Sequence, residues 1–234
     1  MGRDDDELAR RTAAVDLVRR RMINVVGHEL RTPVSAIRGL ADAMLTASDA
    51  ELRGELVPAV ARSAARLERL IDDLLLAAGV TTVLPPAAAR AEPVGPALAS
   101  AWAEVGAPGS LDVRGDTGTD VVVRPRSLGL ILTRVIDNAV KYGSPAVTVC
   151  IVPLGDRVAV EIGSTSALPD SDLELAFEPF FRGEAAVTTA PGFGIGLPVA
   201  RALAEHDGGS LVLERRGDAI VARLELNAAG PGHE

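Results

Sequence analysis

Cysteine, aromatic residues and long apolar runs are all scarce in this sequence. The one cysteine, Cys150, leaves no disulfide framework within the chain, and its place in the alternating run 146–152 predicts a small buried thiol in a strand. No apolar run reaches the about 20 residues that a bilayer-spanning helix needs, and residues 4–7 are acidic, unlike a signal peptide. We therefore expect a soluble protein of a reducing cytoplasm.

An excess of basic residues is also missing. The chain has 24 Lys and Arg against 32 Asp and Glu, a net charge of -8, which argues against nucleic acid as a partner. Aromatic residues make up only 3% of 234 residues while hydrophobic residues make up 47%, so the cores must rely on Leu, Val, Ile and Ala. This length accommodates two modest domains.

The first 80 residues carry two apolar stripes of helical period. Apolar side chains recur every three or four positions from Glu7 to about Leu45, and again from Leu52 to Leu75, with Gly79 as a candidate C-cap. Two long helices joined by a short connection predict an antiparallel hairpin over residues 1–80. A single hairpin cannot bury stripes of this length, so we expect a homodimer in which two hairpins form a four-helix bundle.

The rest of the chain has a mixed pattern. Prolines and alanines interrupt both periodicities and predict a linker over residues 81–95, followed by an α/β sandwich domain over 96–228 and a tail over 229–234. The expected helices are 96–105, 125–142, 170–177 and 196–206, and the expected strands are 111–114, 121–123, 146–152, 157–162, 211–214 and 219–226.

A reactive histidine is predicted in the first helix, where residues 27–33 read Gly-His-Glu-Leu-Arg-Thr-Pro. An imidazole that is largely unprotonated at neutral pH can attack a phosphoryl group. Thr32 lies one turn after His28 on the same face, where its hydroxyl can orient a water molecule. The motif resembles the H-box of the sensor histidine kinase family (HisKA type). That resemblance implies that His28 is the phosphoacceptor and Glu29 its general base, the alternative being a surface histidine among solvated charges.

A second motif, Asp-Asn-Ala-Val-Lys-Tyr over residues 137–142, resembles the N-box of the same family. The resemblance implies ATP and Mg²⁺ as cofactors, with Asn138 ligating Mg²⁺ and Lys141 meeting the phosphates. Asn138, Lys141 and Tyr142 share one helical face. Alone, the segment would be an amphipathic helix with a polar edge. Many family members have a second asparagine where this chain has Arg134, so we expect either a Mg²⁺ site with fewer ligands or a contact of Arg134 with a phosphate.

Two further motifs follow in the family order. Residues 177–183 resemble the F-box, and residues 192–197, Gly-Phe-Gly-Ile-Gly-Leu, resemble the second glycine box. Alternating glycines before a helix let backbone N–H groups approach phosphate oxygens, and the helix N-terminus favours the anion. A glycine-rich turn by itself is more often only a loop. The residues expected to contribute are Gly192, Gly194, Gly196 and Leu197.

The sequence departs from the family pattern at residues 163–167, Gly-Ser-Thr-Ser-Ala, where the first glycine box Asp-x-Gly-x-Gly is expected. Counted back from Phe177, Gly163 takes the place of the aspartate that binds adenine, a loss of roughly ten- to a hundredfold in affinity if uncompensated. Ser164 and Thr165 are the alternative acceptors for that hydrogen bond. The resemblance, which covers residues 19–226, implies a GHKL-type ATP-binding domain, autophosphorylation and transfer to an aspartate of a response regulator receiver domain. The alternative is a pseudokinase, a phosphatase or a dimeric docking platform with weak or no ATP binding.

Overall fold

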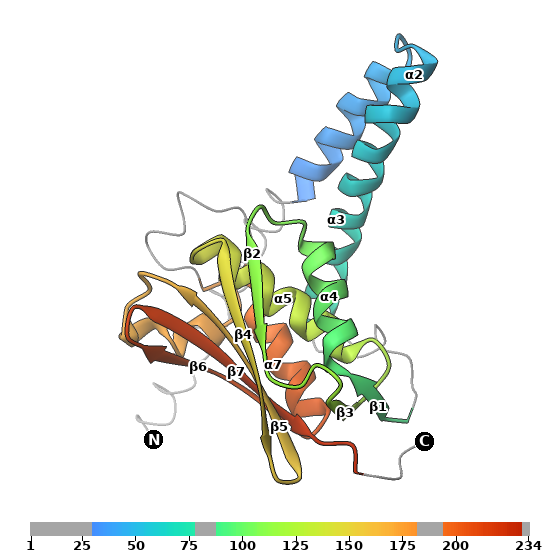
Figure 1. Cartoon of the computed structure of the whole chain (residues 1–234). Helices are drawn as coiled ribbons and strands as arrows, with labels where there is room; N and C mark the ends of the chain where they lie inside the picture. Colours follow the sequence, from blue (N-terminus) through green and yellow to red (C-terminus); the bar gives the residue numbers. More distant parts are fainter. Residues whose placement is uncertain (1–29, 78–87, 182–193, 231–234) are drawn as a thin grey trace, which may run out of the picture. The chain divides into compact units, whose positions relative to one another are not determined.

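The computed structural model describes residues 30–77, 88–181 and 194–230 (Figure 1). These residues divide into two compact units, a helical one that ends at Leu74 and an α/β one that follows it, and each is described by itself. Within the described residues, every helix is too short or too polar to span a bilayer.

The helical unit is a hairpin. Its first helix is described over residues 30–44, and after a short turn the second runs through α2 (Asp49–Glu51), the π-helical turn η1 (Leu52–Leu56) and α3 (Val57–Ala77). The π-helical turn η1 ends two residues before Pro58. Proline has no N–H to donate to the carbonyl oxygen of Gly54, so the α-helical hydrogen-bond pattern cannot continue through that carbonyl.

Several large apolar side chains of the hairpin are exposed in the single chain. Their exposed fractions range from 45% to 84%, and the residues are Val34, Leu45, Val57 and Ile71. The hairpin therefore has the apolar surface that the sequence pattern predicts.

The α/β unit is built on two sheets. The larger has the strand order β2-β4-β5-β7-β6, in which β2 is parallel to β4 and every other pair is antiparallel. The smaller pairs β1 with β3, and a bridge from Val121 to Ala228 connects it to the chain beyond β7. The strands are β1 Arg90–Pro93, β2 Ser110–Arg114, β3 Asp120–Val123, β4 Ala146–Leu154, β5 Arg157–Thr165, β6 Ser210–Arg216 and β7 Ala219–Asn227.

Three helices cover one face of the larger sheet (Figure 1). They are α4 (Val94–Val105), α5 (Ser127–Tyr142) and α7 (Gly196–His206). The middle helix, α5, packs on β4 and β5, while α7 packs on β6 and β7 and α4 lies beside α5. The buried core lies between these layers and includes Leu98, Leu128, Ile131, Leu132, Ile136, Ile162, Leu224 and Leu226. The opposite face of the sheet carries half-buried and charged side chains.

The structure confirms the sandwich and corrects four details. Strand β1 lies in the stretch predicted as linker, and β5 continues past Ile162 to Thr165. The predicted helix 170–177 consists of two 3-10 turns, η3 (Asp170–Asp172) and η4 (Leu175–Phe177). Cys150 is only half-buried, because strand alternation turns it to the open face of β4 while Val149 and Ile151 fill the core.

Candidate functional site

The predicted phosphoacceptor motif is only partly described. His28 and Glu29 lie outside the described residues. Thr32 is exposed on the first helix, and the following Pro33 is buried. Their proposed roles therefore rest on the motif and on the comparisons below.

The N-box residues lie along the last turns of α5. Asn138 is half-buried, and within the described residues its side-chain amide has no hydrogen-bond partner. Lys141 pairs with Asp137 at 2.5 Å, but both side chains are more than a third exposed, so this surface pair holds the lysine only weakly. Tyr142 is half-buried at the end of the helix, where its carbonyl oxygen accepts a hydrogen bond from the Ser166 hydroxyl at 3.0 Å.

The second glycine box begins α7. Gly196 is its first residue, no side chain caps the helix at Ile195, and Pro198 has no N–H. The N–H groups of Gly196 and Leu197 are thus the backbone donors of the first turn that can meet an anion. The Leu197 side chain is buried, so only its backbone faces outward. Gly192 lies outside the described residues.

The N-box helix and the glycine box adjoin each other. A Cβ added to Gly196 would lie 3.9 Å from the Cβ of Arg134, which is in ordinary contact. Arg134, at the second N-box position, is 7% exposed and donates from Nη1 to the carbonyl oxygen of Leu130 at 3.1 Å. Because this residue is buried, we assign it no phosphate contact. The structure thus brings α5 and the N-terminus of α7 together, although Gly196 follows the end of α5 by 54 positions in sequence.

The F-box meets the same glycine box. Phe177 and Phe180 are both buried, and the Phe180 N–H donates to the carbonyl oxygen of Gly194 at 2.9 Å. Gly194 has φ of 67°, and a Cβ there would lie 2.2 Å from the carbonyl oxygen of Phe181. Only glycine satisfies both constraints.

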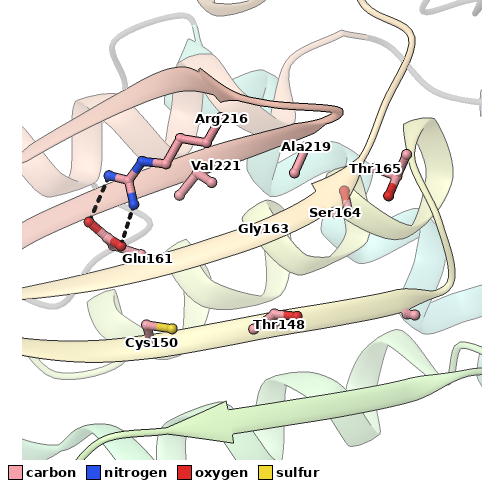
Figure 2. A pocket seen from close by; sticks show the side chains of 10 residues that line it. Thr148, Cys150, Glu161, Gly163, Ser164, Thr165, Arg216, Ala219 and Val221 are labelled. Carbon is pink, nitrogen blue, oxygen red and sulfur yellow. Dashed lines mark hydrogen bonds and ion pairs between the residues drawn. The ribbon is translucent and has the colours of Figure 1, made fainter.

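In the segment 163–167 the structure changes the interpretation of Gly163 as the residue at the adenine-binding position. Gly163 lies on the open face of the sheet, among Thr148, Cys150 and Glu161 (Figure 2). The residue of β5 that faces α5 is Ser164, which is 7% exposed and whose hydroxyl donates to the carbonyl oxygen of Ala139 at 3.1 Å. The position matched to the family aspartate by counting therefore points away from the helices.

The Glu161 side chain lies on the open face of the sheet and is paired there. It accepts two hydrogen bonds from Arg216, at 2.6 and 2.8 Å (Figure 2), and one from Arg223 at 3.0 Å. The Arg216 hydrogen bonds lower the pKa of Glu161 below its ordinary value. Glu161 therefore takes no part in a site between β5 and α5, as its strand position predicts.

The comparisons decide the family. Residues 103–228 match the family model described as histidine kinase-, DNA gyrase B- and HSP90-like ATPase, and residues 18–79 match the His Kinase A (phospho-acceptor) domain. The chain belongs to the histidine kinase family. The two matches occur in the order that the motifs predict. They confirm the resemblance to the sensor histidine kinase family that rests on residues 27–33, 137–142 and 177–197.

Named relatives of this chain agree with the family assignment. The chain is 30% identical to a bacteriophytochrome of Pseudomonas aeruginosa over 92% of its length and 30% of the relative's. It is 30% identical to sensor protein CutS of Streptomyces coelicolor over 94% of its length and 56% of the relative's. A structure of full-length ShkA in complex with AMPPNP superposes with a TM-score of 0.58 at 18% identity, covering 92% of this chain and 45% of that one. The chain thus spans about a third to somewhat over half of these relatives.

An ATPase-type domain implies a bound nucleotide, and the described residues fit one. The Asn138 amide, which has no partner among the described residues, and the uncapped N–H groups of α7 are polar groups that can meet phosphate or a cation, and the exposed Lys141 is held only weakly by Asp137. Asn138 and Lys141 would face the phosphates from α5, while Gly196 and Leu197 would do so through their backbones.

Sequence reasoning missed the face on which Ser164 lies. The signal was present, since a buried Ile162 in a strand turns residue 163 outward and residue 164 inward. The spacing from Phe177 alone, without strand alternation, places the family aspartate at Gly163.

Proposed function

We propose that this chain is the catalytic core of a sensor histidine kinase, working in the cytoplasm where ATP is available. The nucleotide lies between α5 and the N-terminus of α7 and supplies the phosphoryl group. The His28 imidazole forms a P–N bond as the P–O bond to ADP breaks, and Glu29 takes the proton that His28 loses. The phosphoryl group then passes from His28 to an aspartate of a response regulator receiver domain.

The observation that carries this proposal is that the N-box and the second glycine box lie together in the fold. The same chain carries a complete phosphoacceptor motif earlier in its sequence. Three groups of different chemistry would bind one triphosphate: an amide on α5, an ammonium group on α5 and two N–H groups at the start of α7. Such fixed donors act by positioning and by stabilising charge, which is what phosphoryl transfer requires.

We further propose that Asn138 ligates Mg²⁺ through its amide oxygen. A hard cation prefers oxygen ligands, and an amide oxygen adds no charge that would repel the phosphates. Asn138 is half-buried and has no side-chain partner among the described residues, which supports this role.

We propose homodimerisation through the helical hairpin, supported by its exposed apolar side chains and by the His Kinase A domain match. Burying these side chains against a second hairpin removes them from water. Light scattering at micromolar concentration should give the mass of a dimer, and a monomer would contradict the proposal.

The experiment that tests the kinase proposal is incubation of the purified protein with γ-labelled ATP and Mg²⁺, beside the His28→Ala variant. We expect acid-labile, base-stable label on the unmodified protein and none on the variant. Equal label on both proteins would contradict His28 as the acceptor.

A second candidate function is a pseudokinase, a phosphatase or a docking platform for a regulator. It is supported by Ser164, because no carboxylate of β5 faces α5 to bind the adenine amino group. This candidate predicts neither label nor measurable ATP binding, and it retains Thr32 to orient water on a phosphorylated partner.

A further inference from the structure

Arg201 of α7 contacts two other parts of the fold at once, the turn η4 with its N-cap Glu174 and the strand β6. Its guanidinium group lies 3.4 Å from the centre of the Phe177 ring. Nη1 and Nη2 donate to the two carboxylate oxygens of Glu174 at 2.6 and 3.2 Å, and Nε donates to the carbonyl oxygen of Leu211 at 3.1 Å. A planar fork that stacks on a ring while binding a carboxylate is a geometry that lysine cannot reproduce.

These contacts link the F-box to the start of α7. Phe177 ends η4, and three residues later the Phe180 N–H donates to the carbonyl oxygen of Gly194. Gly194 leads within two residues to Gly196, where α7 begins, and Arg201 on the same helix returns to Phe177. Two contacts therefore connect the F-box with α7, one at Gly194 just before the helix and one at Arg201 within it.

The ion pair between Arg201 and Glu174 is the weakest of the contacts that Arg201 makes. The Glu174 side chain is 80% exposed, so its pairing with Arg201 is screened by water and holds little by itself. Phe177 is buried, and the Arg201 side chain is only 22% exposed. The stacking on Phe177 and the hydrogen bond to Leu211 therefore anchor the F-box more than the carboxylate does.

We propose that Arg201 is a positioning residue for the nucleotide site, and this inference rests on the proposed function. It holds residues 174–180, which lead into the F-box, against α7 and thereby fixes the backbone N–H groups of Gly196 and Leu197 that meet the phosphates. Arg201 itself does not contact the nucleotide.

The test compares four variants of the full chain, Arg201→Ala, Arg201→Lys, Glu174→Ala and the control Arg223→Ala. The control is matched because Arg223 is 26% exposed and also pairs with glutamates, Glu161 and Glu225, but on the open face of the sheet. The measurements are the Kd for Mg²⁺-ATP by calorimetry and the rate of His28 labelling at saturating ATP.

We expect Arg201→Ala to raise the Kd about tenfold, because misplaced donors bind the phosphates poorly, while the saturating rate changes much less. Arg201→Lys should recover part of the affinity through its charge, and Glu174→Ala should have a smaller effect than Arg201→Ala. The Kd of Arg223→Ala should match that of the unmodified protein. An unchanged Kd in Arg201→Ala overturns the inference, as does an equal rise in the control.

Amide hydrogen exchange provides a readout that needs no nucleotide. Arg201→Ala should speed exchange at the Phe180 N–H while the amides of β4 and β5 stay protected. Unchanged protection of Phe180 refutes the inference, and faster exchange throughout the domain does so too, since it indicates general destabilisation. Failure of the proposed function would instead appear as absence of ATP binding by the unmodified protein.

Discussion

The Ser164 hydroxyl donates a hydrogen bond to the carbonyl oxygen of Ala139 at 3.1 Å, which joins β5 to the last turn of α5. A Cβ placed on the neighbouring Gly143 would lie 2.4 Å from the Ser164 oxygen and 2.6 Å from the Ala139 oxygen. The end of the N-box helix is therefore packed directly on the strand that carries the departure from the family pattern.

This packing predicts different costs for two small substitutions. Ser164→Ala removes one buried hydrogen bond and should lower the free energy of unfolding by about 1 kcal/mol. Gly143→Ala forces a methyl group against backbone oxygens and should cost about 1–3 kcal/mol. Urea unfolding measures both, and a Gly143→Ala protein as stable as the unmodified one would contradict the close approach.

Gly163→Asp tests which face of β5 belongs to the nucleotide site. Alignment by counting predicts that this change restores the adenine contact and tightens ATP binding. The structure predicts an unchanged Kd, because a side chain at Gly163 meets only Val221 Cγ2 at 3.5 Å and more distant atoms on the open face. Calorimetric titration of the variant with Mg²⁺-ATP distinguishes the two predictions. A roughly tenfold lower Kd would favour the alignment that places the family aspartate at Gly163.

Gly194 and Gly196 should respond differently to alanine. Gly194→Ala combines a left-handed backbone with a clash against the Phe181 carbonyl oxygen, so it should lower the thermal midpoint. Gly196→Ala has room and begins a helix, so it should leave the midpoint unchanged or higher. If the phosphates approach the Gly196 backbone, this second variant should still bind ATP more weakly, as measured by calorimetry. Equal midpoints for the two variants would contradict the geometry at Gly194.

Asn138→Asp should change the dependence of ATP affinity on Mg²⁺ concentration. A carboxylate binds the cation more tightly but repels the phosphates, so affinity without Mg²⁺ should fall. Nucleotide titrations at several Mg²⁺ concentrations measure this, with Asn227→Asp at the exposed end of β7 as the matched control. Identical Mg²⁺ dependence in Asn138→Asp and the unmodified protein would contradict the proposed ligand.

Glu92 should make the fold less stable as pH rises. Burial raises the pKa of Glu92 above 4.5, Arg90 opposes this, and the nearby carboxylate of Asp207 adds to it. Just above pH 4.5 the folded state then binds more protons than the unfolded state, so stability falls as pH rises through the folded pKa. Glu92→Gln should therefore be more stable than the unmodified protein at pH 7, with the difference shrinking toward pH 4.

Glu161→Gln provides the control of opposite sign. Hydrogen bonds from Arg216 lower the pKa of Glu161, so its contribution is present above pH 4.5 and is lost as pH falls through the folded pKa. This variant should be less stable than the unmodified protein at pH 7, with the difference shrinking in acid. Urea unfolding at several pH values measures both, and parallel pH profiles for the two variants would contradict these assignments.

The sequence determined the family, the order of the motifs and most elements of the fold. Residues 27–33 and 137–142 are contiguous motifs, and periods of about 3.6 and 2 residues are local properties that identify helices and strands without knowledge of the fold. For that reason α5, α7 and β4 were predicted within a few residues of their observed bounds.

Only the tertiary structure decided the relationships between distant residues. Strand β1 has little strand character of its own and forms because it pairs with β3. The inward position of Ser164, the contact of Arg201 with Phe177 and the burial of Glu92 near Asp207 each depend on segments that packing brings together. Local periodicity cannot specify such contacts, because their energies come from burial and from partners that lie on other elements.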